Sequence, residues 1–103
     1  MSLSIIIPAY NESDQIELTT KKLKSVIKKI SNIEIIFIDD LSTDDTYFKL
    51  KKISNKFKKI KVYRNKKKGL GPAIECGILK SSKENICIFN LILDLNHERK
   101  FKQ

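Results

Sequence analysis

The apolar positions of the chain follow two alternating patterns. Continuous runs rich in β-branched residues predict four buried strands, at 3–7, 33–38, 60–64 and about 86–91. Between these runs, apolar residues recur at helical spacing and predict three helices, at about 16–30, 47–57 and 72–79. Strand and helix therefore alternate along the whole chain.

Local signals refine where these elements begin and end. Pro8 has no N–H to offer a neighbouring strand, so the first strand is expected to end at Ile7 and lead into a loop at 8–12. Ser42 and Asp45 fit a capping box that opens the second helix. Pro72 suits the first turn of the third helix.

Repeated strand–helix–strand units predict right-handed crossovers between parallel strands. The expected fold is α/β, with a Rossmann-like, mainly parallel sheet and helices on both of its faces. With 103 residues, the chain has room for one modest core, so 1–103 is expected to form a single domain.

Composition and charge narrow the classes of partner. The chain is 41% hydrophobic and 32% charged, as in folded soluble proteins, and its formal net charge of +9 suits an anionic partner. Eleven of the 21 basic residues lie between Lys49 and Lys68, where lysine outnumbers arginine. This favours a solvated lysine-rich surface, so no specific nucleic acid is expected. A basic nucleic-acid-binding module stays open as a third alternative.

Cysteine, histidine and hydropathy patterns exclude several other classes. Cys76 and Cys87 have neither the spacing of a zinc site nor that of a disulfide framework, and His97 is the single histidine. Gly69 and Gly71 follow the third strand rather than the first, which argues against a dinucleotide-binding fingerprint. Charged residues interrupt every apolar run, so the chain is expected to be cytoplasmic.

The ends of the strands are the places to look for a site, because ligands of open parallel sheets bind beyond the carboxyl ends of the strands. The first strand is followed by 8–12, the second by Asp39 and Asp40, and the third by a loop rich in lysine and glycine. A carboxylate there can accept a hydrogen bond from a ring N–H of uracil or guanine, or from a ribose hydroxyl. Asp39, joined directly to the buried strand, is the stronger candidate, while Asp40 also suits a loop or helix-cap role.

Three motifs in order, "IIIPAYNE", "IIFIDDLSTDDT" and "GLGPAIECGI", resemble the amino-terminal half of a family 2 glycosyltransferase with the GT-A fold. The resemblance is to the branch of dolichol- or polyprenyl-phosphate mannosyltransferases. It implies binding of a nucleotide-diphosphate sugar, GDP-mannose or a UDP-sugar, for inverting transfer to an acceptor such as a polyprenyl phosphate. The residues that it implies in binding are Pro8, Ala9, Tyr10, Glu12, Asp39, Asp40, Gly69 and Gly71.

The resemblance also implies a divalent metal, Mg²⁺ or Mn²⁺, held by an Asp-x-Asp segment after the fourth strand. Here "ILDLNH" keeps Asp94 but places Ile92 at the first carboxylate position, so metal binding is expected to be weak. The acceptor-binding region and catalytic base of the family do not follow, and no catalytic residue is assigned. The expectation is therefore a truncated domain that binds nucleotide without transferring sugar.

Two consequences of that expectation stay open. The chain is either a glycosyltransferase-type domain or an inactive, truncated nucleotide-binding paralogue. A parallel sheet that stops after its fourth strand leaves an open edge, which a partner or an oligomer would cover. Association with the cytoplasmic face of a membrane is a further option, since the acceptor implied by the resemblance is a lipid.

Overall fold

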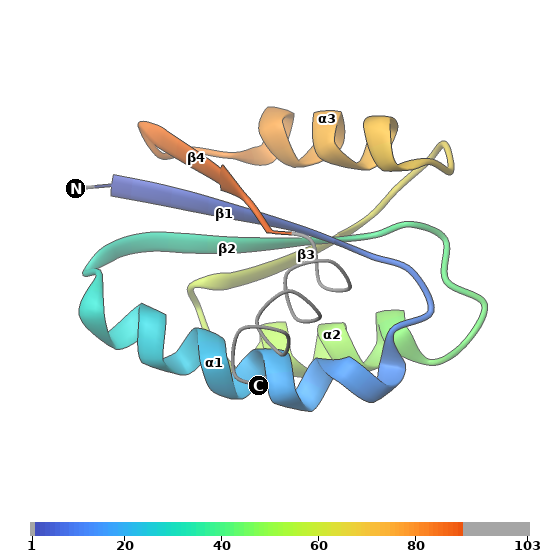
Figure 1. The fold of residues 1–103 in the computed structure, drawn as a ribbon, viewed down its shortest axis with the longest axis horizontal. Helices are drawn as coiled ribbons and strands as arrows, with labels where there is room; N and C mark the ends of the chain where they lie inside the picture. Colours follow the sequence, from blue (N-terminus) through green and yellow to red (C-terminus); the bar gives the residue numbers. More distant parts are fainter. Residues whose placement is uncertain (1, 90–103) are drawn as a thin grey trace, which may run out of the picture.

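The computed structural model describes residues 2–89, and in this range strands and helices alternate as expected (Figure 1). The strands are β1 (Ser2–Ala9), β2 (Asn32–Asp39), β3 (Ile60–Arg64) and β4 (Asn85–Ile88). The helices are α1 (Ile16–Lys29), α2 (Thr46–Lys56) and α3 (Leu70–Lys80), with a 3-10 turn, η1 (Ser13–Gln15), before α1. The end of the fourth strand expected at 90–91 lies outside the described residues.

The four strands form one parallel sheet in the order β3-β2-β1-β4. β1 and β2 occupy its centre, and nearly all of their residues are buried. In the register of the sheet, Ala9 pairs with Asp39, which in turn pairs with Arg64. The last residues of three neighbouring strands are therefore aligned at one edge.

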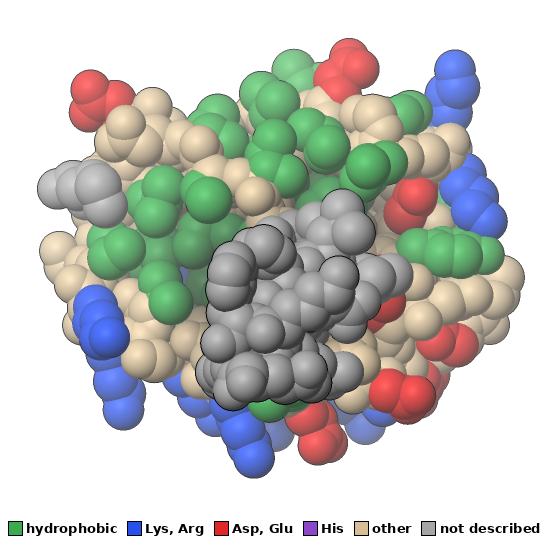
Figure 2. All heavy atoms as spheres, viewed as in Figure 1, with side chains coloured by type: hydrophobic (Ala, Val, Ile, Leu, Met, Phe, Trp, Pro, Cys, Tyr) green, Lys and Arg blue, Asp and Glu red, His purple; other side chains and the backbone are tan. Residues whose placement is uncertain are grey.

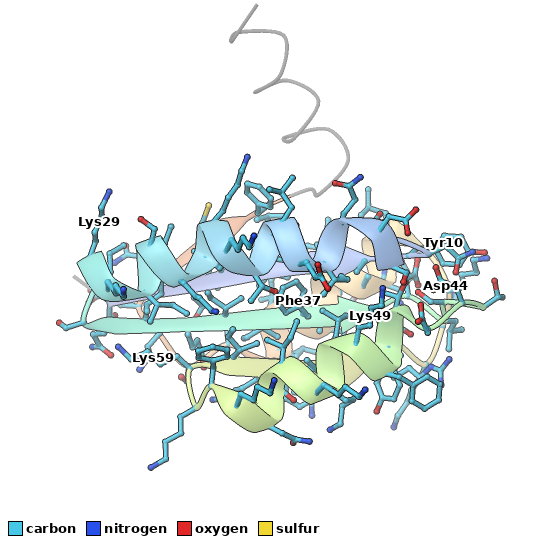
Figure 3. All side chains as sticks on the ribbon, turned by 90° about the horizontal axis from the view of Figure 1, so that it is seen from below. Tyr10, Lys29, Phe37, Asp44, Lys49 and Lys59 are labelled. Carbon is cyan, nitrogen blue, oxygen red and sulfur yellow. The ribbon has the colours of Figure 1, made fainter. Side chains whose placement is uncertain are left out.

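Helices cover both faces of this sheet, as expected for the α/β class. Figure 1 shows α1 and α2 on one side and α3 on the other. Residues two apart in a strand point to the same face, so Ile5, Ile35 and Phe37 pack in a core under α1 and α2. Ile6 and Ile36 form a smaller core under α3. Viewed from the side of α1 and α2, Phe37 lies between these two helices (Figure 3).

The expected stop of the first strand at Pro8 is wrong, because β1 continues to Ala9 and Pro8 pairs with Ile38 of β2. The reason lies in the direction of the missing N–H. The Ile6 carbonyl accepts from Phe89 on the β4 side, and Pro8, two residues later, has its backbone nitrogen on that same side. Among residues 2–89, the register of β4 with β1 runs from Leu3 to Ile6, so the missing N–H of Pro8 interrupts none of these described pairs.

The capping box expected at Ser42 and Asp45 is also wrong, because α2 begins only at Thr46. Asp45 is the N-cap residue but makes no side-chain capping bond, while Oδ1 of the preceding Asp44 accepts from the Thr46 N–H at 2.9 Å. The Ser42 hydroxyl is used elsewhere, as the acceptor for the Asn11 N–H at 2.9 Å. The polar residues of this segment therefore connect two loops instead of opening a helix.

The outer strand β4 exposes apolar side chains. All four residues of β4 are exposed, and Ile86 and Ile88 keep 43% and 46% of their surface accessible. On the face seen in Figure 2, hydrophobic side chains gather over β4 and α3. Among residues 2–89, no helix is long and apolar enough to cross a membrane.

Candidate functional site at the carboxyl edge of the sheet

The loops that follow β1, β2 and β3 are joined at the carboxyl edge of the sheet. The Asp40 N–H donates to the Ala9 carbonyl at 2.8 Å, and the Asn65 N–H donates to the Asp39 carbonyl at 2.8 Å. Tyr10 and Asp44 lie together at this end of the molecule in Figure 3, far from Lys29 and Lys59 at the other end. The predicted convergence of three strand exits is therefore present.

Asp39 is enclosed by its neighbours. It has no exposed surface, and its Oδ2 accepts from the Ser42 N–H at 3.2 Å and lies 3.3 Å from Nε of Arg64. Its Oδ1 is buried without a hydrogen-bond partner among residues 2–89. A ligand cannot touch Asp39 unless this loop moves, so the role of Asp39 as a nucleotide contact stays a prediction.

Asp40 fixes the loop between β3 and α3. Its Oδ1 accepts from the Gly69 N–H at 3.0 Å and from the Asn65 amide at 3.0 Å, and Oδ2 lies 3.2 Å from the same Gly69 nitrogen. Gly69 has a φ of 140°, a backbone conformation that residues with a Cβ rarely adopt. Asp40 keeps 9% of its surface accessible, and a carboxylate has about four acceptor positions, so Oδ2 can accept one more donor.

Tyr10 is the aromatic group of the site. Its ring is half-buried, its hydroxyl accepts from Nζ of Lys68 at 2.9 Å, and that ammonium lies 4.0 Å from the ring centroid. Pro8 and Ala9, which the resemblance implies in donor binding together with Tyr10, are buried in β1. Of these three residues, Tyr10 is the one with substantial surface at the edge.

Asn11 connects the loops after β1 and β2, a role that sequence reasoning missed. Its backbone has a positive φ of 48°, and its side-chain oxygen accepts from the N–H groups of Thr43 at 2.8 Å and Asp44 at 3.3 Å. Next to it, the Glu12 N–H donates to the Thr46 hydroxyl at 3.0 Å. The signal was the paired occurrence of Asn11-Glu12 and the Ser/Thr/Asp-rich segment 42–46.

The surroundings of Glu12 disfavour a negative charge on its carboxyl. Burial raises the pKa of its carboxyl to about 7, a hydrogen bond with the Tyr10 backbone acts in the opposite direction, and the charge of Asp44 raises it further. Its Oε2 is buried and has no hydrogen-bond partner within the described range. Glu12 thus has one buried acceptor atom that is unpaired in this part of the chain.

The raised pKa of Glu12 predicts a pH-dependent effect of Glu12→Gln. Below pH 4.5 the carboxyl is protonated in both the folded and the unfolded chain, so the variant should match the parent in stability. Between pH 4.5 and about 7 the carboxyl ionises in the unfolded parent but stays protonated in the folded parent, so the parent loses stability over this range, and the variant does not. Allowing for solvent screening of this half-buried group, we expect the variant to be more stable by about 1 kcal/mol above pH 7. Urea unfolding across this pH range measures the difference, and parallel pH profiles would contradict it.

Gly71 and the metal position at Asp94 are the remaining parts of the site predicted from the sequence. Gly71 lies in the first turn of α3, exposed, with no heavy atom within 4 Å of an added Cβ, so no close approach requires a glycine there. Asp94 and Ile92 lie outside the described residues. Within residues 2–89, no group of three or more histidine, cysteine or acidic residues could hold a metal. Asp40 and Asp44 are occupied by loop contacts, so the described residues by themselves do not fit a divalent ion.

Comparison with known proteins agrees with the three motifs. The sequence model of the family described as "Glycosyl transferase family 2" matches residues 4–98. A dolichol-phosphate mannosyltransferase of Pyrococcus furiosus is 32% identical over 97 residues, which cover 94% of this chain and 27% of that protein. The chain therefore spans about a quarter of the length of this relative.

Solved structures show the same arrangement of strands and helices. A mannosyltransferase from Pyrobaculum calidifontis, in complex with GDP-Man and Mn²⁺, has a TM-score of 0.77 at 18% identity, covering 86% of this chain and 27% of the other. TarS 1-349 of S. aureus in complex with UDP has a TM-score of 0.68 at 26% identity, covering 88% and 27%. These similarities confirm the α/β fold and its GT-A type.

Proposed function

Because the chain belongs to glycosyltransferase family 2, we propose that its carboxyl edge binds the nucleoside diphosphate of a sugar donor, a UDP-sugar or GDP-mannose. The observation that carries this proposal is the convergence of Tyr10, Asp40 and the Gly69 loop at one end of the sheet. Solved structures similar to this chain were obtained with GDP-Man and with UDP. Donor binding is the function that such an edge supports best.

Each group at the edge has a distinct part in this proposal. Tyr10 offers a half-buried ring against which a base can pack, and Lys68 places a cation beside it for the phosphates. Asp40, which keeps 9% of its surface accessible, accepts the ring N–H of uracil or guanine in place of the fully buried Asp39. Glu12 accepts from a ribose or sugar hydroxyl after a movement of the loop that exposes its buried, unpaired Oε2.

The acceptor and the metal belong to the same proposal. The name of the Pyrococcus relative includes dolichol phosphate, and we propose a lipid phosphate as the acceptor class for the protein to which this sequence belongs. A divalent ion, Mg²⁺ or Mn²⁺, would be held by residues outside the described range, with Asp94 as the candidate ligand. No step of transfer is assigned to residues 2–89, which offer binding groups and not a metal site.

Calorimetric titration with UDP, GDP, CDP and ADP tests the base-reading role. Uracil and guanine present a ring N–H donor, whereas cytosine and adenine present an acceptor at the corresponding ring nitrogen, which a carboxylate repels. UDP or GDP should therefore bind at least about tenfold more tightly than ADP, the factor that one charge-assisted hydrogen bond provides. ADP binding of equal strength would contradict the role of Asp40.

A further inference from the structure

A groove runs between the edge strand β3 and helix α3, on the face of the sheet opposite α1 and α2. It has a volume of about 570 Å³, within the range of ligand-binding clefts. Its lining includes Tyr63, Arg64, Lys66, Lys67, Leu79 and Lys80. Tyr10, Asp40 and Gly69 are not among the lining residues, so the groove is separate from the proposed base contacts.

The groove has an excess of positive charge. Four basic side chains line it against one acidic side chain, Glu75. Arg64 is partly neutralised, since its Nε lies 3.3 Å from Asp39. Within the described part of the chain, Lys66, Lys67 and Lys80 have no carboxylate at ion-pair distance, and all three are exposed. Three uncompensated charges therefore surround one groove.

Apolar groups lie next to these charges. Pro72, Cys76 and Leu79 follow one another at helical spacing along the wall that α3 contributes. Leu79 keeps 77% of its surface accessible, more than any other large hydrophobic residue described. Apolar groups beside several lysines are the combination found on protein surfaces that lie at a membrane interface.

We propose that the β3–α3 groove binds the phosphate headgroups of anionic phospholipids and holds the protein at a membrane surface, with Leu79 reaching the acyl boundary. Nucleic acid fits the same charges less well. Single-stranded nucleic acid is usually bound by several aromatic side chains that stack on successive bases, whereas Tyr63 is the one aromatic residue that lines this groove. The proposal rests on the groove alone and stands or falls independently of nucleotide binding.

Vesicle flotation with two matched triple variants tests this proposal. Lys66→Gln/Lys67→Gln/Lys80→Gln removes the uncompensated charges of the groove. Lys51→Gln/Lys52→Gln/Lys56→Gln removes equal charge from exposed positions of α2, on the opposite face of the sheet. Binding of the parent to phosphatidylcholine vesicles should require added phosphatidylglycerol. The groove variant should bind these anionic vesicles roughly fifty-fold more weakly, and the α2 variant should lose less than about threefold, because such attraction falls off within a Debye length.

A third variant tests the apolar contact of Leu79, and two other ligands distinguish a lipid headgroup from nucleic acid and from free phosphate. Leu79→Ser should weaken vesicle binding by roughly fivefold to tenfold without altering net charge. Equal losses in the two triple variants would show attraction by net charge alone and overturn the proposal. Tighter binding of a polyuridylate oligomer than of the vesicles would also overturn it. So would displacement of the protein from the vesicles by inorganic phosphate under conditions in which sodium chloride of equal ionic strength does not displace it.

Discussion

Asp40→Ala is expected to lower the free energy of unfolding by roughly 3 kcal/mol and to remove measurable nucleotide binding. The substitution deletes the acceptor of the Gly69 N–H and of the buried Asn65 amide, and hydrogen bonds to a charged group contribute roughly 1.5–3 kcal/mol each. Without this acceptor, the β3–α3 loop loses its side-chain contacts with the end of β2 and keeps the backbone bond between Asn65 and Asp39. Urea unfolding measures the stability, and calorimetry with UDP and GDP measures the binding.

Asp14→Ala is the matched control for the loss of one carboxylate. Asp14 is exposed in η1 and outside the network of loop contacts, so this variant should stay within about 0.5 kcal/mol of the parent and bind nucleotide normally. If Asp40→Ala kept both the stability and the nucleotide affinity of the parent, Asp40 would have neither of the roles assigned to it.

Gly77→Ala is expected to destabilise the fold by roughly 2 kcal/mol although alanine favours a helix. An added Cβ at this position would lie 2.3 Å from Cγ2 of Ile6, which is fully buried in the central strand β1. Overpacking of this kind costs roughly 3 kcal/mol, of which the helix propensity of alanine returns about 1 kcal/mol. The measurement is again the free energy of unfolding in urea.

Gly71→Ala provides the same substitution in the same helix without a steric conflict. No heavy atom lies within 4 Å of the added Cβ, so helix propensity alone should act and stabilise the chain by roughly 0.5–1 kcal/mol. The two variants should therefore differ by about 3 kcal/mol. Equal stabilities would mean that α3 does not pack against β1 as closely as the structure has it.

The strands, helices and class of the fold could be predicted from the sequence because burial on both faces leaves a strong signal. β1 and β2 are central strands, and such strands are apolar at nearly every position, as in Ile5–Ile7 and Ile35–Ile38. The boundaries were harder to predict, since they depend on neighbours. Pro8 is tolerated within β1 because none of the described β1–β4 pairs involves it, and that depends on the register of a strand about 80 residues later.

The site was predicted as a place but not in its internal contacts. Strand alternation was enough to bring Tyr10, Asp40 and Gly69 to one edge. It could not show which of two adjacent aspartates faces inward, because Asp39 is buried through its contacts with Arg64 and Ser42. The sequence also could not show that Glu12 has a buried, unpaired carboxylate oxygen, because this depends on how the surrounding backbone folds.

The contacts of Glu34, a buried residue away from the site, could not be predicted from the sequence either. Glu34 accepts from Ser4 at 2.6 Å and from the Ser82 N–H at 2.5 Å, and it lies 3.0 Å from Nζ of Lys61. Burial by itself raises the pKa of its carboxyl, but these donors outweigh burial and lower the pKa to about 2. An acidic residue inside an apolar strand gave no sign in the sequence that its partners come from three other segments.

The most direct test of the central claim is a nuclear magnetic resonance titration of the isotopically labelled chain with UDP. If the nucleotide binds at the carboxyl edge, the amide signals of Tyr10, Asp40 and Gly69 should shift in a saturable manner. Those of Ser82 and Lys83, near the buried Glu34 cluster, should not. Saturable shifts confined to the Ser82 region or to the β3–α3 groove, or no shifts at any concentration, would contradict the assignment of the nucleotide site.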